Sequence, residues 1–525
     1  MAAGDQQEQE GNEGCVDWYY RAALAAWRHL EAMPLAQAGS RDYQDACQVY
    51  QRSLHGLVAS ATRYGRLDPR GRLSIVDGGG RRAVPIEYSG FAWKPCDFCE
   101  VLPADDFGRS DLENYYHTHG LGVSLVAVRH ACSREMYYRS KQPFSVTAVL
   151  RPARSAAGDS AAPSCDQCGT VLTFYNPCLL DSLRVGSMVI AMERDLSAPF
   201  AYALRESPRR FTEGFLDPDD ADVRPKLLMM EPYQPGKIPV VFIHGLWSDP
   251  MTWVDMVNEL RTQSDLCQHY QFWYFQYPTG GELLQSAAVL RERLLLAREQ
   301  FDPQHRDGAM ERIVLVGHSM GGLMAQLQAS YSYDILWRHA ASRPLESVRA
   351  TPAVRDRLQR VFFFGPSPLV KRVVFIGTPH RGSGMTERVI GRVASSLVQY
   401  SGPEATQYRQ LMEDNRHVFK EYLWKTRPTS VELLEPSNPL LLAMLQMPFG
   451  CDVKLHSIIG TGGRTLTGEV SDGIVAVSSA RLPGVCSELF IPTQHGKLHR
   501  DPTCVAELTR ILRQHDQQDA RKLKM

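Results

Sequence analysis

Ser319 lies between two glycines in the stretch "GHSMG", which runs from Gly317 to Gly321. A serine hydroxyl is a poor nucleophile at neutral pH, so its chemistry requires a base, a group that orients the base, and donors for an oxyanion. The pentapeptide alone is a weak signal. Its surroundings strengthen it, because "RIVLV" before it is typical of a buried strand and "GLMAQLQASYSY" after it is typical of a helix. The glycines permit the sharp strand-to-helix turn that presents a nucleophilic serine.

The acid and the base that Ser319 requires are expected further along the chain. In a parallel sheet with this type of turn, the acid follows a later strand and precedes the base. The strand "KRVVFIGT" leads into "PHRGSG", which has no carboxylate, so Asp472 after the next strand is the expected acid and Glu469 is its rival. His495 is the expected base because it lies nearer the end of the last strand, "SELFIP", than the alternative, His499.

Backbone N–H groups are the expected oxyanion donors. The strand in "VVFIHGLWS" ends at His244 and Gly245, which leaves the N–H of Leu246 available to act with that of Met320, the residue after the serine. His380 in "TPHRG" precedes the expected acid, and we predict that it fixes its loop rather than acting as the base.

The elements that position these residues have the pattern of an α/β domain over residues 230–525. Fully apolar runs, "IPVVFIHG", "RIVLVG", "KRVVFIGT" and "DVKLHSIIG", alternate with helical stretches, as in a mostly parallel sheet covered on both faces. Insertions near residues 334–368 and 384–450 contain apolar stretches that suit either a lid over the site or the core. The last helix, "DPTCVAELTRILRQH", is expected to leave His515 on its solvated surface.

The first 229 residues have a different character. Residues 1–69 contain two stretches with helical spacing, "WYYRAALAAWRHL" and "YQDACQVYQRSLHGLVASA", and Ser40 or Asp42 is available to cap the second. Residues 70–229 contain short β-type runs such as "RLSIVD", "LGVSLVAVR", "FSVTAVL" and "VLTFYN". We predict a helical pair followed by a mixed α+β region whose role the sequence does not reveal.

Composition excludes some partners and leaves others open. Lys plus Arg and Asp plus Glu both number 58, so the chain has no overall basic field and nucleic acid is a poor candidate partner. No apolar run approaches the roughly 18 residues that a membrane helix needs. The acidic N-terminus does not resemble a signal peptide, so the sequence as written predicts a cytoplasmic protein. A start upstream of Cys15 would instead suggest a lipoprotein anchor. The sequence leaves open whether the protein contacts a membrane surface and what its oligomeric state is.

Two CxxC pairs could hold a metal ion. Cys96 and Cys99 form one pair, Cys165 and Cys168 the other, and four thiolates would complete a tetrahedral zinc site. The pairs are much further apart than the usual spacing of about 15 to 20 residues. Unligated thiols are therefore favoured, and no metal or cofactor is expected.

Residues 236–515 resemble α/β-hydrolases of the lipase/esterase type and are similar to the GPI-inositol-deacylase-like serine hydrolases. Besides "GHSMGG", the resemblance rests on "FIHGLWSDPMTW", "FIGTPHRGS", "SVELLEPSNPLL" and "SDGIVAVSSA", in that order. It implies that Ser319, Asp472 and His495 form a triad, with the N–H groups of Leu246 and Met320 as oxyanion donors. It also implies hydrolysis of a carboxylic ester of a lipid or another hydrophobic acyl compound. Amide cleavage, acyl transfer and a non-catalytic binding scaffold are the alternatives.

Overall fold

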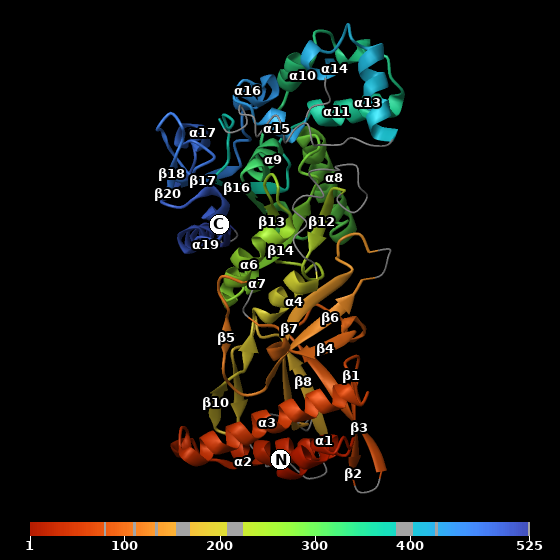
Figure 1. Ribbon diagram of the computed structural model, residues 1–525, viewed down its shortest axis with the longest axis vertical. Helices are drawn as coiled ribbons and strands as arrows, with labels where there is room; N and C mark the ends of the chain where they lie inside the picture. The colour runs from red at the N-terminus through yellow and green to blue at the C-terminus, as the bar shows by residue number, and fades with distance from the viewer. Residues whose placement is uncertain are drawn as a thin grey trace. The chain divides into compact units, whose positions relative to one another are not determined.

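The computed structural model describes residues 1–77, 80–108, 112–131, 135–153, 169–206, 224–384, 403–425 and 429–522. The chain forms two compact units (Figure 1). One comprises Met1–Pro208 together with Asn258–Gln268, and the other comprises Arg209–Val257 together with His269–Met525.

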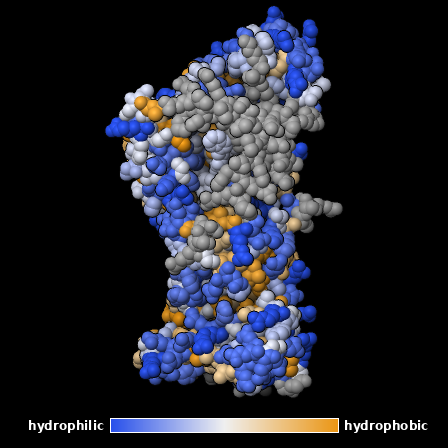
Figure 2. Space-filling view, viewed as in Figure 1, coloured by the Kyte–Doolittle hydropathy of each residue, from blue (hydrophilic) through white to orange (hydrophobic). Residues whose placement is uncertain are grey.

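The N-terminal unit begins with three helices: α1 (Ala2–Gln9), α2 (Cys15–Ala32) and α3 (Arg41–Arg63). The predicted helical pair is confirmed, because α2 and α3 pack against each other. Ser40 is the N-cap of α3, since its side chain accepts a hydrogen bond from the N–H of Tyr43 at 3.1 Å. The surface over these helices is mostly hydrophilic (Figure 2).

A seven-stranded sheet packs on the helices of the N-terminal unit. Its order is β1-β2-β3-β8-β7-β6-β4. The strands are β1 (Leu67–Asp68), β2 (Arg72–Asp77), β3 (Gly80–Ser89), β4 (Glu100–Pro103), β6 (Val123–His130), β7 (Lys141–Pro152) and β8 (Thr170–Tyr175). The unit also contains β5 (His117–Thr118), β9 (Ser182–Val185), β10 (Met188–Ala191), β11 (Arg194–Asp195) and α4 (Ala198–Glu206).

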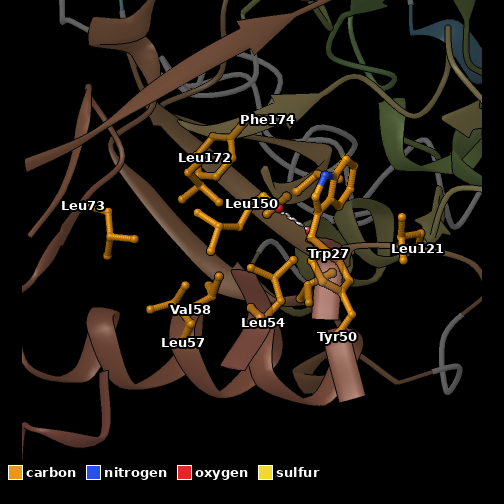
Figure 3. Close-up of a cluster of buried hydrophobic side chains, with 14 of the residues drawn as sticks. Trp27, Tyr50, Leu54, Leu57, Val58, Leu73, Leu121, Leu150, Leu172 and Phe174 are labelled. Carbon is orange, nitrogen blue, oxygen red and sulfur yellow. Dashed lines mark hydrogen bonds between the residues drawn. The ribbon is translucent and has the colours of Figure 1, made fainter. Parts of the chain in front are cut away.

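The core of this unit lies between α2, α3 and the sheet (Figure 3). Trp27 of α2 contacts Tyr50 of α3, with 5.6 Å between ring centroids. The Tyr50 hydroxyl donates to the carbonyl of Leu150 at 2.8 Å and accepts from its N–H at 2.9 Å. These two bonds tie the helix to β7 and satisfy the buried hydroxyl of Tyr50.

The second unit is built on a second seven-stranded sheet, in the order β12-β14-β13-β15-β16-β17-β20. Only the β12–β14 pairing is antiparallel among these, so the predicted mostly parallel α/β sheet is confirmed. The strands are β12 (Lys226–Met229), β13 (Ile238–Ile243), β14 (Tyr270–Gln276), β15 (Ile313–His318), β16 (Val370–Ile376), β17 (Lys454–Gly460) and β20 (Ser487–Ile491).

Helices follow most of these strands, as the alternating pattern predicts. They are α6 (Val254–Leu260), α7 (Ser264–His269), α8 (Leu283–Phe301), α9 (Met320–Ala329), α10 (Ile335–Ala340), α11 (Pro352–Phe362), α13 (Pro403–Asp414), α14 (Glu421–Lys425), α15 (Ser430–Leu433), α16 (Pro439–Gln446), α17 (Val477–Ala480), α18 (His495–Leu498) and α19 (Pro502–Lys522). None of the helices in the described ranges is long and apolar enough to cross a membrane.

The two predicted insertions pack on each other. The N–H of Ser342 donates to the carbonyl of Val418 at 2.8 Å, and the N–H of Arg349 donates to the Asn415 side chain at 2.6 Å. A cavity of about 300 Å³ lies among α8, α11, α13 and α16, with apolar walls that include Phe362.

The expectation that His515 is solvated is wrong. His515 is 4% exposed, and its Nε2–H donates to the carbonyl of Arg312 at 2.9 Å. It follows Leu508 and Ile511 at helical spacing, so it lies on the buried stripe of α19. Its single buried donor is satisfied by a carbonyl at the start of β15.

Candidate active site

Ser319 occupies a strained turn between β15 and α9. Its backbone has φ +54° and ψ −126°, outside the regions that residues other than glycine ordinarily adopt. Glycine is required on both sides, because a Cβ on Gly317 would lie 2.5 Å from the carbonyl oxygen of Gly321. A Cβ on Gly321 would lie 2.2 Å from the carbonyl oxygen of Ile243. The turn therefore needs the glycine pattern seen in the sequence.

Asp472 and His495 form a buried pair. His495 Nδ1 donates to Asp472 Oδ2 at 2.7 Å, and the two side chains are 8% and 1% exposed. The other carboxylate oxygen of Asp472 accepts from the N–H groups of Ile474 and Val475 at 2.9 and 2.7 Å. Because a carboxylate only accepts hydrogen bonds, this contact puts the proton of a neutral His495 ring on Nδ1 and makes Nε2 a basic nitrogen.

One cavity of about 250 Å³ is lined by Ser319, His495 and Leu246. Ser319 is 8% exposed, so it lies in the wall of this cavity rather than on open surface. Met320 is the first residue of α9, and Leu246 follows the end of β13. Neither the backbone N–H of Met320 nor that of Leu246 donates a hydrogen bond to another residue in the described part of the chain. Leu246 lines the cavity, and Met320 is the buried residue that directly follows Ser319.

Two further histidines, His318 and His499, line the same cavity as His495. The ring of His318 lies 4.8 Å from those of both His495 and His499, and its Nε2 donates to the carbonyl of His495 at 3.1 Å. Burial, and then the neighbouring His499 and His495, hold the pKa of His318 well below its ordinary value. His318 is therefore a neutral donor that fixes the backbone of His495. His499 also contacts the Trp253 ring at 5.9 Å.

The other residues singled out from the sequence, His380 and Glu469, lie outside the contact between Asp472 and His495. His380 is buried and its ring Nδ1 bonds to the Gln326 side chain at 2.8 Å, which ties the loop after β16 to α9. Glu469 accepts from the N–H of Ser478 at 3.1 Å in an exposed turn, while Asp472 contacts His495. His495 is the first residue of α18, a single helical turn that follows β20.

The cysteine pairs are described only in part. Cys96 is exposed and Cys99 is half-buried, and both are free thiols. Cys165 and Cys168 lie outside the described residues. The zinc hypothesis for these four residues therefore stays a hypothesis.

Some residues of the site were missed by sequence reasoning. His318, Ser248, Thr252, Asp255 and Arg500 line the same cavity as Ser319. The pentapeptide contains His318, but its spacing carries no indication of a contact with a residue near the C-terminus. Ser248, Thr252 and Asp255 follow β13, and Arg500 precedes α19. These segments are far apart in the sequence, and only the fold brings them together.

Buried histidines should make the second unit sensitive to mild acid. Burial lowers the pKa of His244 to about 4, and those of His380 and His456 to about 3. In the unfolded chain each histidine takes up a proton near pH 6.5, whereas in the folded chain its ring stays neutral to a lower pH. The contribution of these rings to the free energy of unfolding is therefore fully present above pH 6.5 and declines as the pH falls below it. Each ring should add a slope of up to about 1.4 kcal/mol per pH unit.

Urea unfolding between pH 7.0 and 5.5 measures this slope. We expect the free energy of unfolding to fall with pH, and His380→Gln to reduce the slope by roughly half a proton on average, approaching one proton toward pH 5.5. The exposed His55→Gln is the matched control and should leave the slope unchanged. A stability that is constant or rises toward pH 5.5 would rule out this explanation.

Three features of this unit are those of an α/β-hydrolase. They are the mostly parallel sheet, the strained serine turn after β15, and the Asp–His pair whose members follow β17 and β20. Residues 240–501 match the model of the alpha/beta hydrolase family, and through this segment the chain belongs to that family. Comparison with curated proteins gave no match.

Several solved structures are similar to part of the chain. A lipase of Bacillus licheniformis in its mature form is 17% identical, with a TM-score of 0.32, and the match covers 53% of this chain and 93% of the lipase. An esterase of Thermogutta terrifontis with butyrate bound is 11% identical, with a TM-score of 0.31, covering 55% and 88%. Esterase B of Lactobacillus rhamnosis is 13% identical, with a TM-score of 0.31, covering 57% and 84%.

Proposed function

We propose that this protein is a serine hydrolase that cleaves carboxylic esters, with Ser319 as nucleophile, His495 as base and Asp472 as the group that orients the base. The observation that carries the proposal is the placement of Ser319 and His495 in one cavity, with His495 held by Asp472 at 2.7 Å. The strained backbone of Ser319 supports it, because such strain collects at functional sites.

The proposed reaction has two halves. His495 Nε2 takes the proton of Ser319 Oγ as that oxygen attacks the ester carbonyl carbon, and the N–H groups of Leu246 and Met320 stabilise the oxyanion. The carbon–oxygen bond to the alcohol then breaks, and His495 gives the proton to the leaving alcohol. Water next attacks the acyl-enzyme with His495 again as base, which releases the acid and restores Ser319.

The size of the cavity supports an ester of modest size. Leu246, Trp247 and Ile474 contribute apolar surface to it, and the last two are 47% and 39% exposed. Its volume of about 250 Å³ is below the usual range of ligand pockets, about 300 to 1,000 Å³. We therefore expect p-nitrophenyl butyrate or octanoate to be cleaved with a higher kcat/KM than the palmitate.

A chain-length series on the full protein, with and without an added acceptor alcohol, tests this preference. A new ester formed from the acceptor would identify acyl transfer, and cleavage of the matching p-nitroanilides at a similar rate would identify an amidase. Preference for the palmitate would show that the acyl chain extends beyond this cavity.

Asp472→Asn should lower kcat by about 10⁴-fold at neutral pH. The substitution keeps the size of the side chain and the acceptor for the N–H groups of Ile474 and Val475. It removes the charge that holds the Nδ1 proton of His495, so the ring can present the wrong tautomer to the serine. Steady-state ester hydrolysis and a thermal melt of the same sample separate catalysis from folding.

Glu469→Gln is the matched control for the acid. Glu469 is the rival carboxylate in the same segment, and its exposed side chain accepts a hydrogen bond from the N–H of Ser478 at 3.1 Å. We expect its kcat to stay within about 2-fold of the parent, as for most exposed substitutions. The reverse result, with Glu469→Gln inactive and Asp472→Asn active, would move the role of the acid to Glu469.

A further inference from the structure

A histidine-rich pair of short strands lies in the N-terminal unit, away from the residues of the proposed triad in the sequence. The strand β5 pairs antiparallel with β11, with Thr118 opposite Arg194 and His117 opposite Asp195. In this register His119 lies opposite Glu193. Side chains alternate along a strand, so His117, His119 and Glu193 share one face of the ribbon.

The three side chains converge on one carboxylate oxygen. The Nε2 atom of His117 contacts Glu193 Oε1 directly, and Nδ1 of His119 lies 3.8 Å from the same oxygen. The two imidazole rings are 4.4 Å apart, and one ligand atom from each of the three residues lies within 4.8 Å of the others. Two ligands of a tetrahedral zinc ion, each at about 2.0 to 2.1 Å, are about 3.3 Å apart, which is close to this spacing.

The carboxylate of Glu193 is held by other bonds. Its second oxygen, Oε2, accepts from the N–H of Gly120 at 2.8 Å and from the Gln51 side chain at 3.4 Å. Its backbone carbonyl accepts from the Thr147 hydroxyl at 2.6 Å. These contacts turn Oε1 toward the histidines, in the way that hydrogen bonds to the free end of a ligand orient metal-binding side chains.

The neighbouring carboxylate, Asp195, has a different role. One of its oxygens accepts from the Tyr115 hydroxyl at 2.7 Å, and the other accepts from the N–H groups of Ser197 and Ala198 at 3.0 and 2.8 Å. It is therefore engaged, and it contributes negative charge beside His117 rather than a further ligand. A cation placed among the two histidines and Glu193 would be attracted by both carboxylates.

We propose that His117, His119 and Glu193 bind one divalent transition-metal ion, with Zn²⁺ as the first candidate. Two imidazole nitrogens and one carboxylate oxygen are donors that Zn²⁺ accepts, and water would complete the tetrahedron. Binding replaces the direct His117–Glu193 contact with two metal–ligand bonds. His119 has a side chain 86% exposed, which gives the ion a path from solvent. This proposal is independent of the chemistry proposed at Ser319.

Metal titration of the full, untagged protein after treatment with a chelator tests the proposal. Co²⁺ is the spectroscopic probe, followed by displacement with Zn²⁺, and the thermal melt is recorded with and without each ion. We expect one Co²⁺ with the visible bands of nitrogen and oxygen ligands, and a higher Tm when the ion is bound. His119→Ala should weaken binding by at least about 100-fold, since even loss of a supporting outer-shell residue costs 10- to 100-fold.

Two further variants make the result specific. Glu193→Gln keeps the shape of the side chain but removes its charge, and it should also lose the ion. His130→Ala is the matched control, because His130 pairs with Glu100 at 3.0 Å and both side chains are 45% exposed. Equal binding by the parent and His119→Ala would overturn the proposal, as would a parent that binds no metal. Bands of Co²⁺–thiolate bonds that persist in His119→Ala would place the ion at cysteines and would also overturn it.

Discussion

Replacing Ser319 with alanine is expected to lower kcat for ester hydrolysis by about 10⁶-fold, close to the loss seen when the nucleophile of a serine triad is removed. Alanine has the same Cβ, so the unusual backbone of the turn is retained and the melting temperature should change little. Binding should persist, because Leu246, Trp247 and the other walls of the cavity are unaffected. Steady-state kinetics with p-nitrophenyl butyrate measure the loss.

Two companion variants control the Ser319 result. Ser264→Ala changes an exposed serine on α7 and should keep the activity of the parent. Ser319→Gly removes the side chain from a position with φ +54°, so it should be as inactive as the alanine variant and melt no lower than it. Retention of substantial activity by Ser319→Ala in a folded protein would reject Ser319 as the nucleophile.

Replacing His495 with alanine should have an effect of the same size, about 10⁶-fold, because a serine triad acts as a unit. Both histidines line the cavity with Ser319, but His495 is bonded to Asp472 at 2.7 Å, whereas His499 contacts the rings of His318 and Trp253. We therefore expect His499→Ala to reduce kcat far less, through weaker positioning of its neighbours.

A double variant distinguishes the two histidines further. If His495 is the base, adding His495→Ala to Ser319→Ala should cause almost no additional loss, because each single change already removes the shared function. Adding His499→Ala to Ser319→Ala should then add whatever loss His499→Ala causes alone. The opposite pattern would assign the role of the base to His499.

The hydrolase sheet could be predicted because parallel strands buried on both faces are continuous apolar runs. The runs that include Ile238–Ile243 and Val370–Ile376 are of this kind, and they became β13 and β16. Strand β3 was missed, since Arg81, Arg82 and Pro85 hide the alternation of Val84 and Ile86. Its burial alternates only in its second half, so the sequence pattern is too short to reveal it.

The candidate site was predicted in its chain order but not in its contacts. Asp472 and His495 were selected from their positions after strands, and the structure brings them to 2.7 Å. Their catalytic role stays a prediction. The His117, His119 and Glu193 cluster gave no signal, because Glu193 is distant in sequence and reaches the histidines only through the pairing of β5 with β11. Ribbons of two residues have no periodicity that could indicate such a contact.

The most direct test of the proposed function is to locate the covalent adduct that the parent protein forms with a fluorophosphonate. The full chain is treated with the reagent, digested and examined by mass spectrometry, while loss of ester hydrolysis is followed in the same sample. The proposed mechanism predicts one phosphonylated peptide that contains Ser319, formed in step with the loss of activity. Modification of a different serine in step with that loss, or full activity after Ser319 is modified, would contradict it.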